Sequence, residues 1–418
     1  MMPNTRRHGN RIRLGWIGTG VAAAAWLLLC DGVSLRGHQA GPARAARPTN
    51  TYWVYAGAES ADVLHRIRFG PGGLVVEQTT TIGELPNEME GPHGLAISAD
   101  GKYLYMTTGH GRPDGKLWKY ELGPDKLVAE GLSLGNFPAS VDVTPDGLYS
   151  LSVNFNLHGD MVPSTVSVVY TPDNTEVARI VTCTMPHGSR VDPSGRRQYS
   201  TCMMDDQLVE IDTVKFEVSR RFSLAKGKEG PLVVTADPHA AHVMAGAKPA
   251  PVVDPAEVGY PAGAKHEMTP ATCSPTWAQP SADGKRIFVA CNKADEIVEI
   301  DRDGWTIARR LPTGRGVYNL AVTPDGKLLL ATLKQGSLFE IFDLATGKSR
   351  ARLKTGTTIA HGVAVSPDSR YAFVTSEGVG SAPGKVDAVD LQTLTVVGTV
   401  DVGQQASGIA FWKMSAGK

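Results

Sequence analysis

Apolar and polar residues alternate in short runs that recur along most of the chain. Residues 95–108, 320–333 and 363–376 each contain two such runs around a turn of the type Ser/Thr-Pro/Ala-Asp-Gly/Ser. Alternation with a period of two predicts β-strands, and the turn between the runs predicts an antiparallel pair. After a variable loop, a third apolar run follows that often ends in Asp, as in residues 297–301. The repeated unit is therefore a set of at least three antiparallel strands.

The spacing of this unit indicates the architecture. The position seven residues before the turn Asp falls, with its aligned C-terminal equivalent, at His93, Ala139, His187, Gly230, Thr276, Tyr318, His361 and Ser407. Successive positions are 42 to 48 residues apart, and such a period with several strands per repeat is typical of β-propeller blades. We therefore predict an all-β protein with a single β-propeller of eight blades. Seven blades remain the alternative if the Pro/Gly/Ala-rich residues 246–267 belong to a degenerate unit.

The two ends of the repeat region complement each other. Residues 51–69 have the pattern of a second and a third strand without a first, whereas residues 406–413 have the pattern of a first strand alone. Pairing of the N-terminal strands with the C-terminal strand would complete one blade and close the ring, leaving no long exposed sheet edge.

These strand-turn-strand units resemble the YVTN/YncE-like family of exported β-propeller proteins over about residues 51–412. An eight-bladed ring also resembles the haem d1-binding propellers. The chain has no Cys-x-x-Cys-His motif, so a fused haem c domain is not supported. The resemblance implies the fold, but not the function, because this family is functionally diverse.

The N-terminus has the features of an export signal. Arginines precede an apolar stretch, Leu14–Cys30, and an Ala-x-Ala cleavage pattern follows at Ala43–Ala45. We predict that residues 1–50 are a targeting segment and residues 51–418 the propeller, located in the periplasm or secreted. An uncleaved membrane anchor is the alternative. With 42 basic and 42 acidic residues, the chain lacks the basic excess expected of a nucleic-acid-binding protein, and no membrane contact beyond the anchor is expected.

The body of the protein contains four cysteines, in two pairs with similar spacing. Cys183 and Cys202 are 19 residues apart, and Cys273 and Cys291 are 18 apart. In each pair the first cysteine precedes a first strand and the second ends the adjacent second strand. We therefore expect two disulfides, each within one blade. The rival interpretation is that Cys202, with the two following methionines, supplies soft ligands to a copper ion near His187.

Five histidines fall at positions that a propeller brings to one end of its central channel. Loops that precede the first strand and loops that follow the second strand lie on the same face. The predicted cluster consists of His93, His110, His158, His187 and His361. Neutral imidazole is the commonest metal ligand, so this cluster predicts a transition-metal site, with copper favoured. Histidines that converge from several blades resemble the arrangement in copper-containing propeller enzymes such as nitrous oxide reductase.

Two further polar residues are candidates for cofactor binding near these histidines. Arg190 lies within a first strand, where a charge is costly unless it faces the channel or an anion. Asp160 follows His158 and could orient it. His65 is expected at the surface of an outer strand. For any single histidine the alternative is a purely structural role, in which the ring bonds to the backbone.

The function expected from these features is that of a metal-dependent periplasmic oxidoreductase with its substrate at the channel mouth. A non-enzymatic scaffold of the cell envelope, which binds a protein or a small ligand there, is the main alternative. Binding of a haem-like cofactor with one histidine as axial ligand and lactonase-type hydrolysis are two others.

Overall fold

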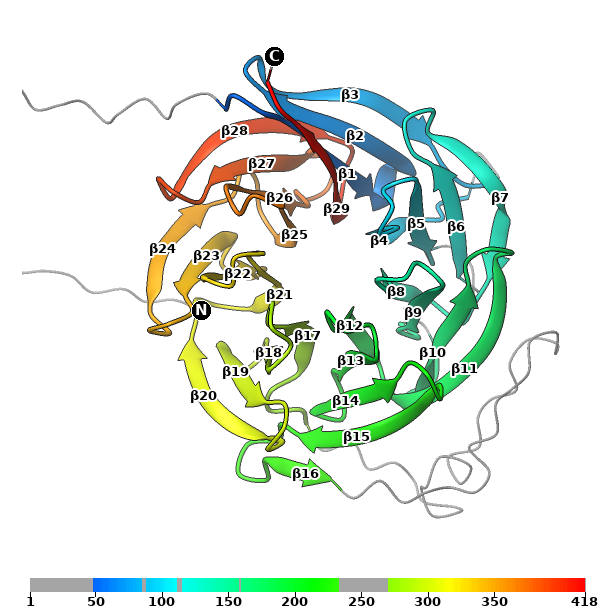
Figure 1. Cartoon of the computed structure of the whole chain (residues 1–418), viewed down its shortest axis with the longest axis vertical. Helices are drawn as coiled ribbons and strands as arrows, with labels where there is room; N and C mark the ends of the chain where they lie inside the picture. Colours follow the sequence, from blue (N-terminus) through cyan, green and yellow to red (C-terminus); the bar gives the residue numbers. More distant parts are fainter. Residues whose placement is uncertain (1–47, 85–87, 111–114, 158, 233–269, 418) are drawn as a thin grey trace, which may run out of the picture. The chain divides into compact units, whose positions relative to one another are not determined.

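Seven antiparallel sheets surround a common axis in the computed structural model, which describes residues 48–84, 88–110, 115–157, 159–232 and 270–417 (Figure 1). Each sheet is a blade of four strands joined as a meander, and one blade carries a short fifth strand. Among the described residues there is no helix long and apolar enough to cross a membrane. The chain is thus a single all-β propeller, as predicted.

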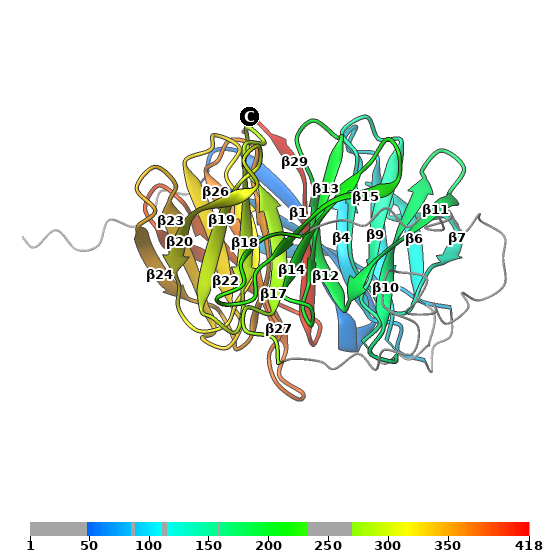
Figure 2. The same ribbon diagram turned by 90° about the horizontal axis from the view of Figure 1, so that it is seen from below.

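The first strand of each blade lies next to the axis and the second strand packs outside it (Figures 1 and 2). The first strands are β4 (Pro92–Ile97), β8 (Pro138–Val143), β12 (Pro186–Val191), β17 (Pro275–Pro280), β21 (Val317–Val322), β25 (Ala360–Val365) and β29 (Ala406–Ser415). The second strands are β5 (Tyr103–Thr108), β9 (Tyr149–Asn154), β13 (Arg197–Cys202), β18 (Arg286–Cys291), β22 (Leu328–Leu333), β26 (Tyr371–Ser376) and β1 (Thr51–Ala58). These second strands are almost continuously buried, because neighbouring blades cover both of their faces.

The third and fourth strands form the outer part of each blade. The third strands are β6 (Lys116–Glu121), β10 (Pro163–Tyr170), β14 (Gln207–Asp212), β19 (Glu296–Asp301), β23 (Leu338–Asp343), β27 (Gly384–Asp390) and β2 (Val63–Gly70). The fourth strands are β7 (Lys126–Ser133), β11 (Thr175–Thr184), β15 (Glu217–Ser223), β20 (Thr306–Pro312), β24 (Ser349–Lys354), β28 (Thr395–Val402) and β3 (Gly73–Thr81). Fourth strands alternate between exposed and partly buried residues, as expected of an outer edge with one solvated face.

Hydrogen bonds join each blade to the next around the whole ring, and they establish the number of blades. They join His93 Nδ1 to Ala139 O, Ser140 Oγ to His187 O, His187 Nδ1 to Thr276 O, Thr276 Oγ1 to Tyr318 O, Thr332 Oγ1 to His361 O, Thr375 Oγ1 to Ser407 O, and Ser407 Oγ to Pro92 O. Seven contacts link seven blades in the described part of the chain and return to the first. The prediction of eight blades was therefore wrong, and the seven-bladed alternative holds.

The missing blade was expected to begin near Gly230. Instead, Gly230 lies in β16 (Gly230–Leu232), a short strand added to the outer edge of the blade β12–β15. The hydrogen bond of 2.9 Å between His187 in β12 and Thr276 in β17 joins the two blades that the predicted unit would separate. The remainder of that unit lies outside the described residues. A strand-turn pattern at Gly230 was mistaken for a full blade, although no third-strand pattern followed it.

The closing blade contains both ends of the propeller. β29 from the C-terminus pairs with β1 from the N-terminal part, and β2 and β3 complete the sheet. This closure agrees with the expectation from the sequence. It joins the two ends of the ring by backbone hydrogen bonds along almost the whole length of β1.

His65 in β2 is a structural residue of this closing blade and not the surface residue that was expected, since it is 7% exposed. Its Nδ1–H donates to Thr79 Oγ1 at 2.9 Å, and its Nε2 accepts the N–H of Gly403 at 2.9 Å. Both ring nitrogens are therefore used by the neutral form. Burial lowers the pKa of His65 from 6.5 to about 4.

This buried histidine predicts a pH dependence of stability. Between pH 6.5 and 4 the unfolded chain takes up a proton at His65 while the folded chain resists it, so stability falls as the pH falls. The expected loss is at most about 3 kcal/mol, and it does not grow below pH 4. Urea denaturation of wild type and of His65→Gln at pH 7.5 and pH 4.5 measures it. A wild-type loss over this range no larger than that of the variant would contradict the assignment.

The cysteines form the two expected disulfides, Cys183–Cys202 and Cys273–Cys291, with Cα atoms 5.8 Å and 4.5 Å apart. Cys273 and Cys291 lie within or just before one blade, as predicted. Cys183 instead belongs to the outer strand β11 of one blade and Cys202 to β13 of the next, so this disulfide joins two blades. The expectation that both disulfides lie within blades was wrong for this pair, because β11 extends to Thr184, close to the start of the next first strand.

Candidate metal centre

Three of the predicted histidines converge at one mouth of the central channel. His93, His187 and His361 each occupy the second position of a first strand, in β4, β12 and β25. The ring centroid of His93 lies 6.0 Å from that of His187 and 5.3 Å from that of His361. The histidines are only 3–7% exposed. The register of the repeats predicted that these three histidines lie together, and the structure confirms it.

A shared backbone turn makes this histidine position equivalent in all seven blades. Two residues before it, the chain adopts a left-handed conformation in every blade, with φ between 47° and 71°, at Gly91, Phe137, Met185, Ser274, Gly316, Ile359 and Gln405. Five of these residues are not glycine, and such a conformation costs a non-glycine residue about 1 kcal/mol or more. The turn is a property of the fold, whereas the side chain that follows it differs from blade to blade.

The neighbouring blade orients the ring of His93 so that its Nε2 is available to bind a metal ion. Its Nδ1 lies 2.6 Å from the carbonyl oxygen of Ala139. Because a carbonyl can only accept, Nδ1 carries the proton and Nε2 presents a lone pair to the channel. Histidines that bind metals usually hold the proton of their other nitrogen in such a bond, which fixes the tautomer and the ring orientation.

Nδ1 of His187, like that of His93, is bonded to a backbone carbonyl of the neighbouring blade, but Nε2 of His187 has a hydrogen-bond partner of its own. Its Nδ1–H donates to the carbonyl oxygen of Thr276 at 2.9 Å, and its Nε2 accepts the hydroxyl of Tyr318 at 3.0 Å. Burial, followed by the effect of neighbouring His93, lowers the pKa of His187 to about 3. His187 is therefore a neutral residue with both nitrogens engaged, and its role in this arrangement is to position Tyr318.

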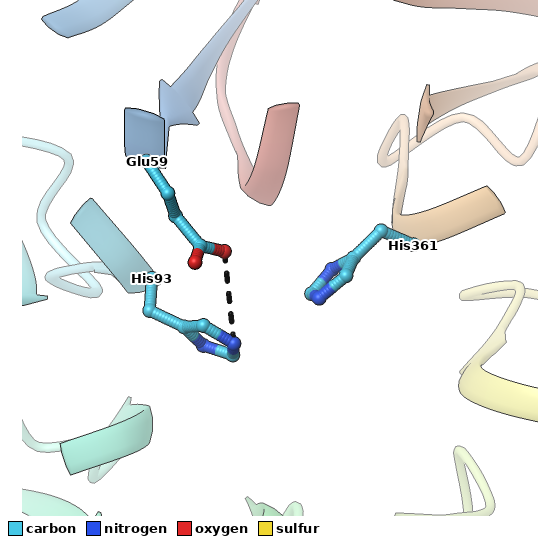
Figure 3. A group of neighbouring side chains, drawn as sticks. All are labelled: Glu59, His93 and His361. Carbon is cyan, nitrogen blue, oxygen red and sulfur yellow. Dashed lines mark ion pairs between the residues drawn. The ribbon is translucent and has the colours of Figure 1, made fainter. Parts of the chain in front are cut away.

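A buried carboxylate, Glu59, completes the cluster from the closing blade (Figure 3). It is the first residue after β1 and begins the short 3-10 helix η1 (Glu59–Ala61). Its Oε2 accepts Nε2–H of His110 at 2.6 Å and the side-chain amide of Gln405 at 3.0 Å. Its Oε1 lies 3.7 Å from Nε2 of His93. In the neutral tautomer of His93, this distance separates two electron-pair donors, an arrangement that a cation would stabilise.

Glu59, His93 and His361 together can hold a single metal ion. One ligand atom from each residue lies within 4.8 Å of the other two, and Figure 3 shows the three side chains pointing toward a common centre. Ligand atoms bound to one transition metal lie roughly 2 Å from it, so small side-chain rotations would complete the coordination. Two imidazoles and one carboxylate form a ligand set used for several divalent metals.

The electrostatics favour the metal-binding forms of these residues. Burial lowers the pKa of His93, and burial together with the cation Lys334 holds the pKa of His361 well below its ordinary value. Both imidazoles are thus neutral at pH 7. Burial opposes the anionic form of Glu59, whereas the hydrogen bond that His110 donates at 2.6 Å favours it and acts to lower the pKa of this carboxyl group.

The remaining walls of the site differ in character. On one side, Nζ of Lys334 lies 2.8 Å from Oε1 of Glu377 and 4.3 Å from the ring centroid of Tyr318. Oε1 of Glu377 is also 3.8 Å from Nε2 of His361. On the other side, the ring of Phe137 packs 4.6 Å from that of His110. A charged wall and an aromatic wall therefore enclose the histidines.

The sequence contained a signal for the acidic and basic residues that were missed. Glu59, Lys334 and Glu377 are each the first residue after the second strand of a blade, in β1, β22 and β26. The rule that placed His110 at this mouth, in a loop after a second strand, applies to all three residues. It was applied to histidines alone, and so the carboxylate of the candidate metal centre was overlooked.

The other predicted site residues lie elsewhere. Arg190 lines the channel below the histidines, with its guanidinium 4.5 Å from the ring centroid of Trp277. Asp160 lies between β9 and β10, where its carbonyl oxygen accepts a hydrogen bond of 2.8 Å from the side-chain amide of Asn156. His158 lies outside the described residues, so its place in the cluster stays a prediction. Cys202 is in a disulfide, so the interpretation of its thiolate as a copper ligand was wrong.

Comparisons with known proteins agree on the architecture. The model of the family described as YNCE-like beta-propeller matches residues 128–410. Hydrazine synthase of Kuenenia stuttgartiensis is similar in structure, with a TM-score of 0.56 and 17% identity, over 80% of this chain and 92% of that chain. A functionally unknown protein from Desulfotomaculum acetoxidans has a TM-score of 0.60 and 16% identity, over 86% and 98%. No curated protein matches the sequence. At these identities the structural likeness shows the fold alone.

Proposed function

The chain belongs to the YNCE-like β-propeller family, and on that premise we propose that Glu59, His93 and His361 bind a divalent transition-metal ion. The observation that carries this proposal is the pairing of the His93 Nε2 lone pair with a carboxylate oxygen 3.7 Å away, inside a group whose three ligand atoms lie within 4.8 Å. Without a cation, burial of these groups side by side is unfavourable. With one, every ligand atom has a partner.

Copper(II) is the first candidate for this ion. Copper(II) binds sites of nitrogen and oxygen ligands more tightly than the other divalent first-row metals. The two disulfides support an oxidising location for the protein, the periplasm or the exterior of the cell. Iron(II) and zinc accept the same ligand set, and metal analysis distinguishes them.

A redox reaction on a small molecule is the activity that we propose for the loaded site. Three protein ligands leave positions on the metal open, as in catalytic rather than structural centres. Burial excludes bulk water, and the hydroxyl of Tyr318, held 3.0 Å from Nε2 of His187, is a proton donor within the same mouth. Burial raises the pKa of Tyr318 to about 12, so this hydroxyl keeps its proton at neutral pH.

Metal analysis of protein exported through its own N-terminal segment tests the proposal. We expect about one equivalent of copper per chain and, for the Cu²⁺ form, an electron paramagnetic resonance spectrum with nitrogen couplings from two imidazoles. Failure to bind Cu²⁺, Fe²⁺ or Zn²⁺ with better than micromolar affinity would sink the metal site and favour the envelope scaffold. A metal that binds but cannot be reduced and reoxidised would reject the redox activity alone.

A further inference from the structure

A narrow cavity runs along the axis directly below the candidate metal centre. His93 and His361 line one end of it, Trp277 and Asn319 line its wall, and Arg190 lies at the other end. It has a volume of about 20 Å³, which is room for one or two water molecules. We call this space the axial cavity.

Two buried polar atoms in the axial cavity have no protein partner among the described residues. They are Nε1 of Trp277 and Oδ1 of Asn319. These residues are 6% and 5% exposed. Buried donors and acceptors are nearly always hydrogen-bonded, and a buried water commonly supplies the bond where the protein does not. A donor and an acceptor that face the same narrow space are suitable partners for ordered water.

A larger cavity follows the axial cavity at the opposite mouth. It has a volume of about 260 Å³, and its lining includes Asp142, Asp192 and Gln279. In β8 and β12 the residues that line it, Asp142 and Val191, directly follow Val141 and Arg190 of the axial cavity. The two spaces are therefore consecutive along the strands. We call the larger one the lower vestibule.

Arg190 and Asp142 lie at the junction of these two spaces. Oδ2 of Asp142 accepts the N–H of Val191 at 2.8 Å, which ties the carboxylate to the strand of Arg190. The Arg190 guanidinium covers the indole of Trp277, whose Nε1 is one of the unpaired atoms. At the same register, other blades place alanine, as at Ala321 and Ala364. Arg190 and Asp142 are thus confined to one side of the junction.

We propose that the axial cavity is a water-filled passage that connects the lower vestibule to the metal centre. The metal in this inference rests on the proposed function, whereas the water rests on the unpaired atoms of Trp277 and Asn319. Because the passage has room for only one or two water molecules, it admits reactants of the size of water or dioxygen and excludes larger ones. The small substrate of the redox reaction would then reach the metal from the face opposite the histidine mouth.

The first test needs no metal. In the metal-free protein, hydrogen exchange of the Trp277 indole N–H is measured by NMR, with its signal assigned by Trp277→Phe. The internal control is the indole N–H of Trp118, which is 2% exposed and bonded to Thr108 Oγ1 at 2.9 Å. We expect exchange at Trp277 to be at least tenfold faster than at Trp118. Exchange as slow as at Trp118 would show that the cavity is dry and overturn the passage.

The second test measures water exchange at the metal. In the Cu²⁺-loaded protein, Asn319→Leu is expected to reduce the paramagnetic enhancement of water proton relaxation at least fivefold, because an apolar side chain of similar size dries the passage. Cu²⁺ affinity should stay within threefold of wild type, since Asn319 is not a ligand. The control is Trp412→Phe, whose indole bonds to Gly101 O in the turn between β4 and β5 and does not line the axial cavity. Unchanged relaxation in Asn319→Leu would refute access to the metal along the axis. Failure of the wild-type protein to bind Cu²⁺ would refute the metal site instead, and the indole exchange of Trp277 would then show whether the cavity contains water.

Discussion

Replacement of His93 by glutamine is expected to lower the affinity for Cu²⁺ by more than 100-fold. His93 supplies the imidazole nitrogen whose lone pair faces Oε1 of Glu59 at 3.7 Å, and glutamine keeps the approximate size but removes that nitrogen. Loss of a residue that merely orients a ligand commonly costs 10- to 100-fold in metal affinity, so loss of the ligand should cost more. Competition with a chelator of known affinity measures the constant.

A graded series separates ligands from positioning residues. His110→Gln removes the hydrogen bond of 2.6 Å that orients Glu59, and we expect a 10- to 100-fold loss. His65→Gln, which changes a buried histidine bonded only to β3 and the Gly403 loop, is the matched control and should leave the affinity unchanged at pH 7.5. If His93→Gln binds Cu²⁺ within threefold of wild type, the metal is held elsewhere.

Replacement of Gly408 by alanine is expected to destabilise the protein by about 3 kcal/mol, a large effect for one methyl group. A Cβ at this position in β29 would lie 2.0 Å from the backbone oxygen of His93 in β4. That oxygen belongs to a strand that is paired within its own blade, so it cannot move without shifting β4. The contact lies where the closing blade meets its neighbour, and strain there opposes closure of the ring.

Urea denaturation of Gly408→Ala measures this effect. The matched control is Gly72→Ala, in the exposed turn between β2 and β3, where a Cβ would meet no atom within 4 Å. We expect the control to lie within 0.5 kcal/mol of wild type, as is usual for surface substitutions. The displaced backbone of His93 should also weaken metal binding in Gly408→Ala. A variant as stable as the control would be evidence against the close approach of β29 and β4.

The fold was largely predictable because its signals are local and repeated. Period-two alternation and Asp-Gly turns mark each hairpin, and a period of 42 to 48 residues marks each blade. The number of blades, in contrast, could not be predicted from local sequence patterns. The segment near Gly230 has a strand-turn pattern, but whether it forms a blade depends on whether β12 can bond directly to β17, as His187 and Thr276 show.

The candidate site was predictable in position but not in composition. Register placed His93, His187 and His361 at one mouth, and the structure brings them together. The pattern could not show that Tyr318 occupies Nε2 of His187, which removes that nitrogen from the ligand set, because this contact joins residues 131 positions apart. Nor could it show that Arg190 lies below the cluster beside Trp277.

Strand period and chain order are sufficient to predict the repeating blade, the closure of the ring by its two ends and the face that bears the histidines. The number of blades, the inter-blade partner of Cys183 and the place of Glu59 in the candidate metal centre become visible only in the folded protein. These features depend on contacts between blades, whose distances are set by the packing of seven sheets around one axis. No local pattern of residues encodes such a distance.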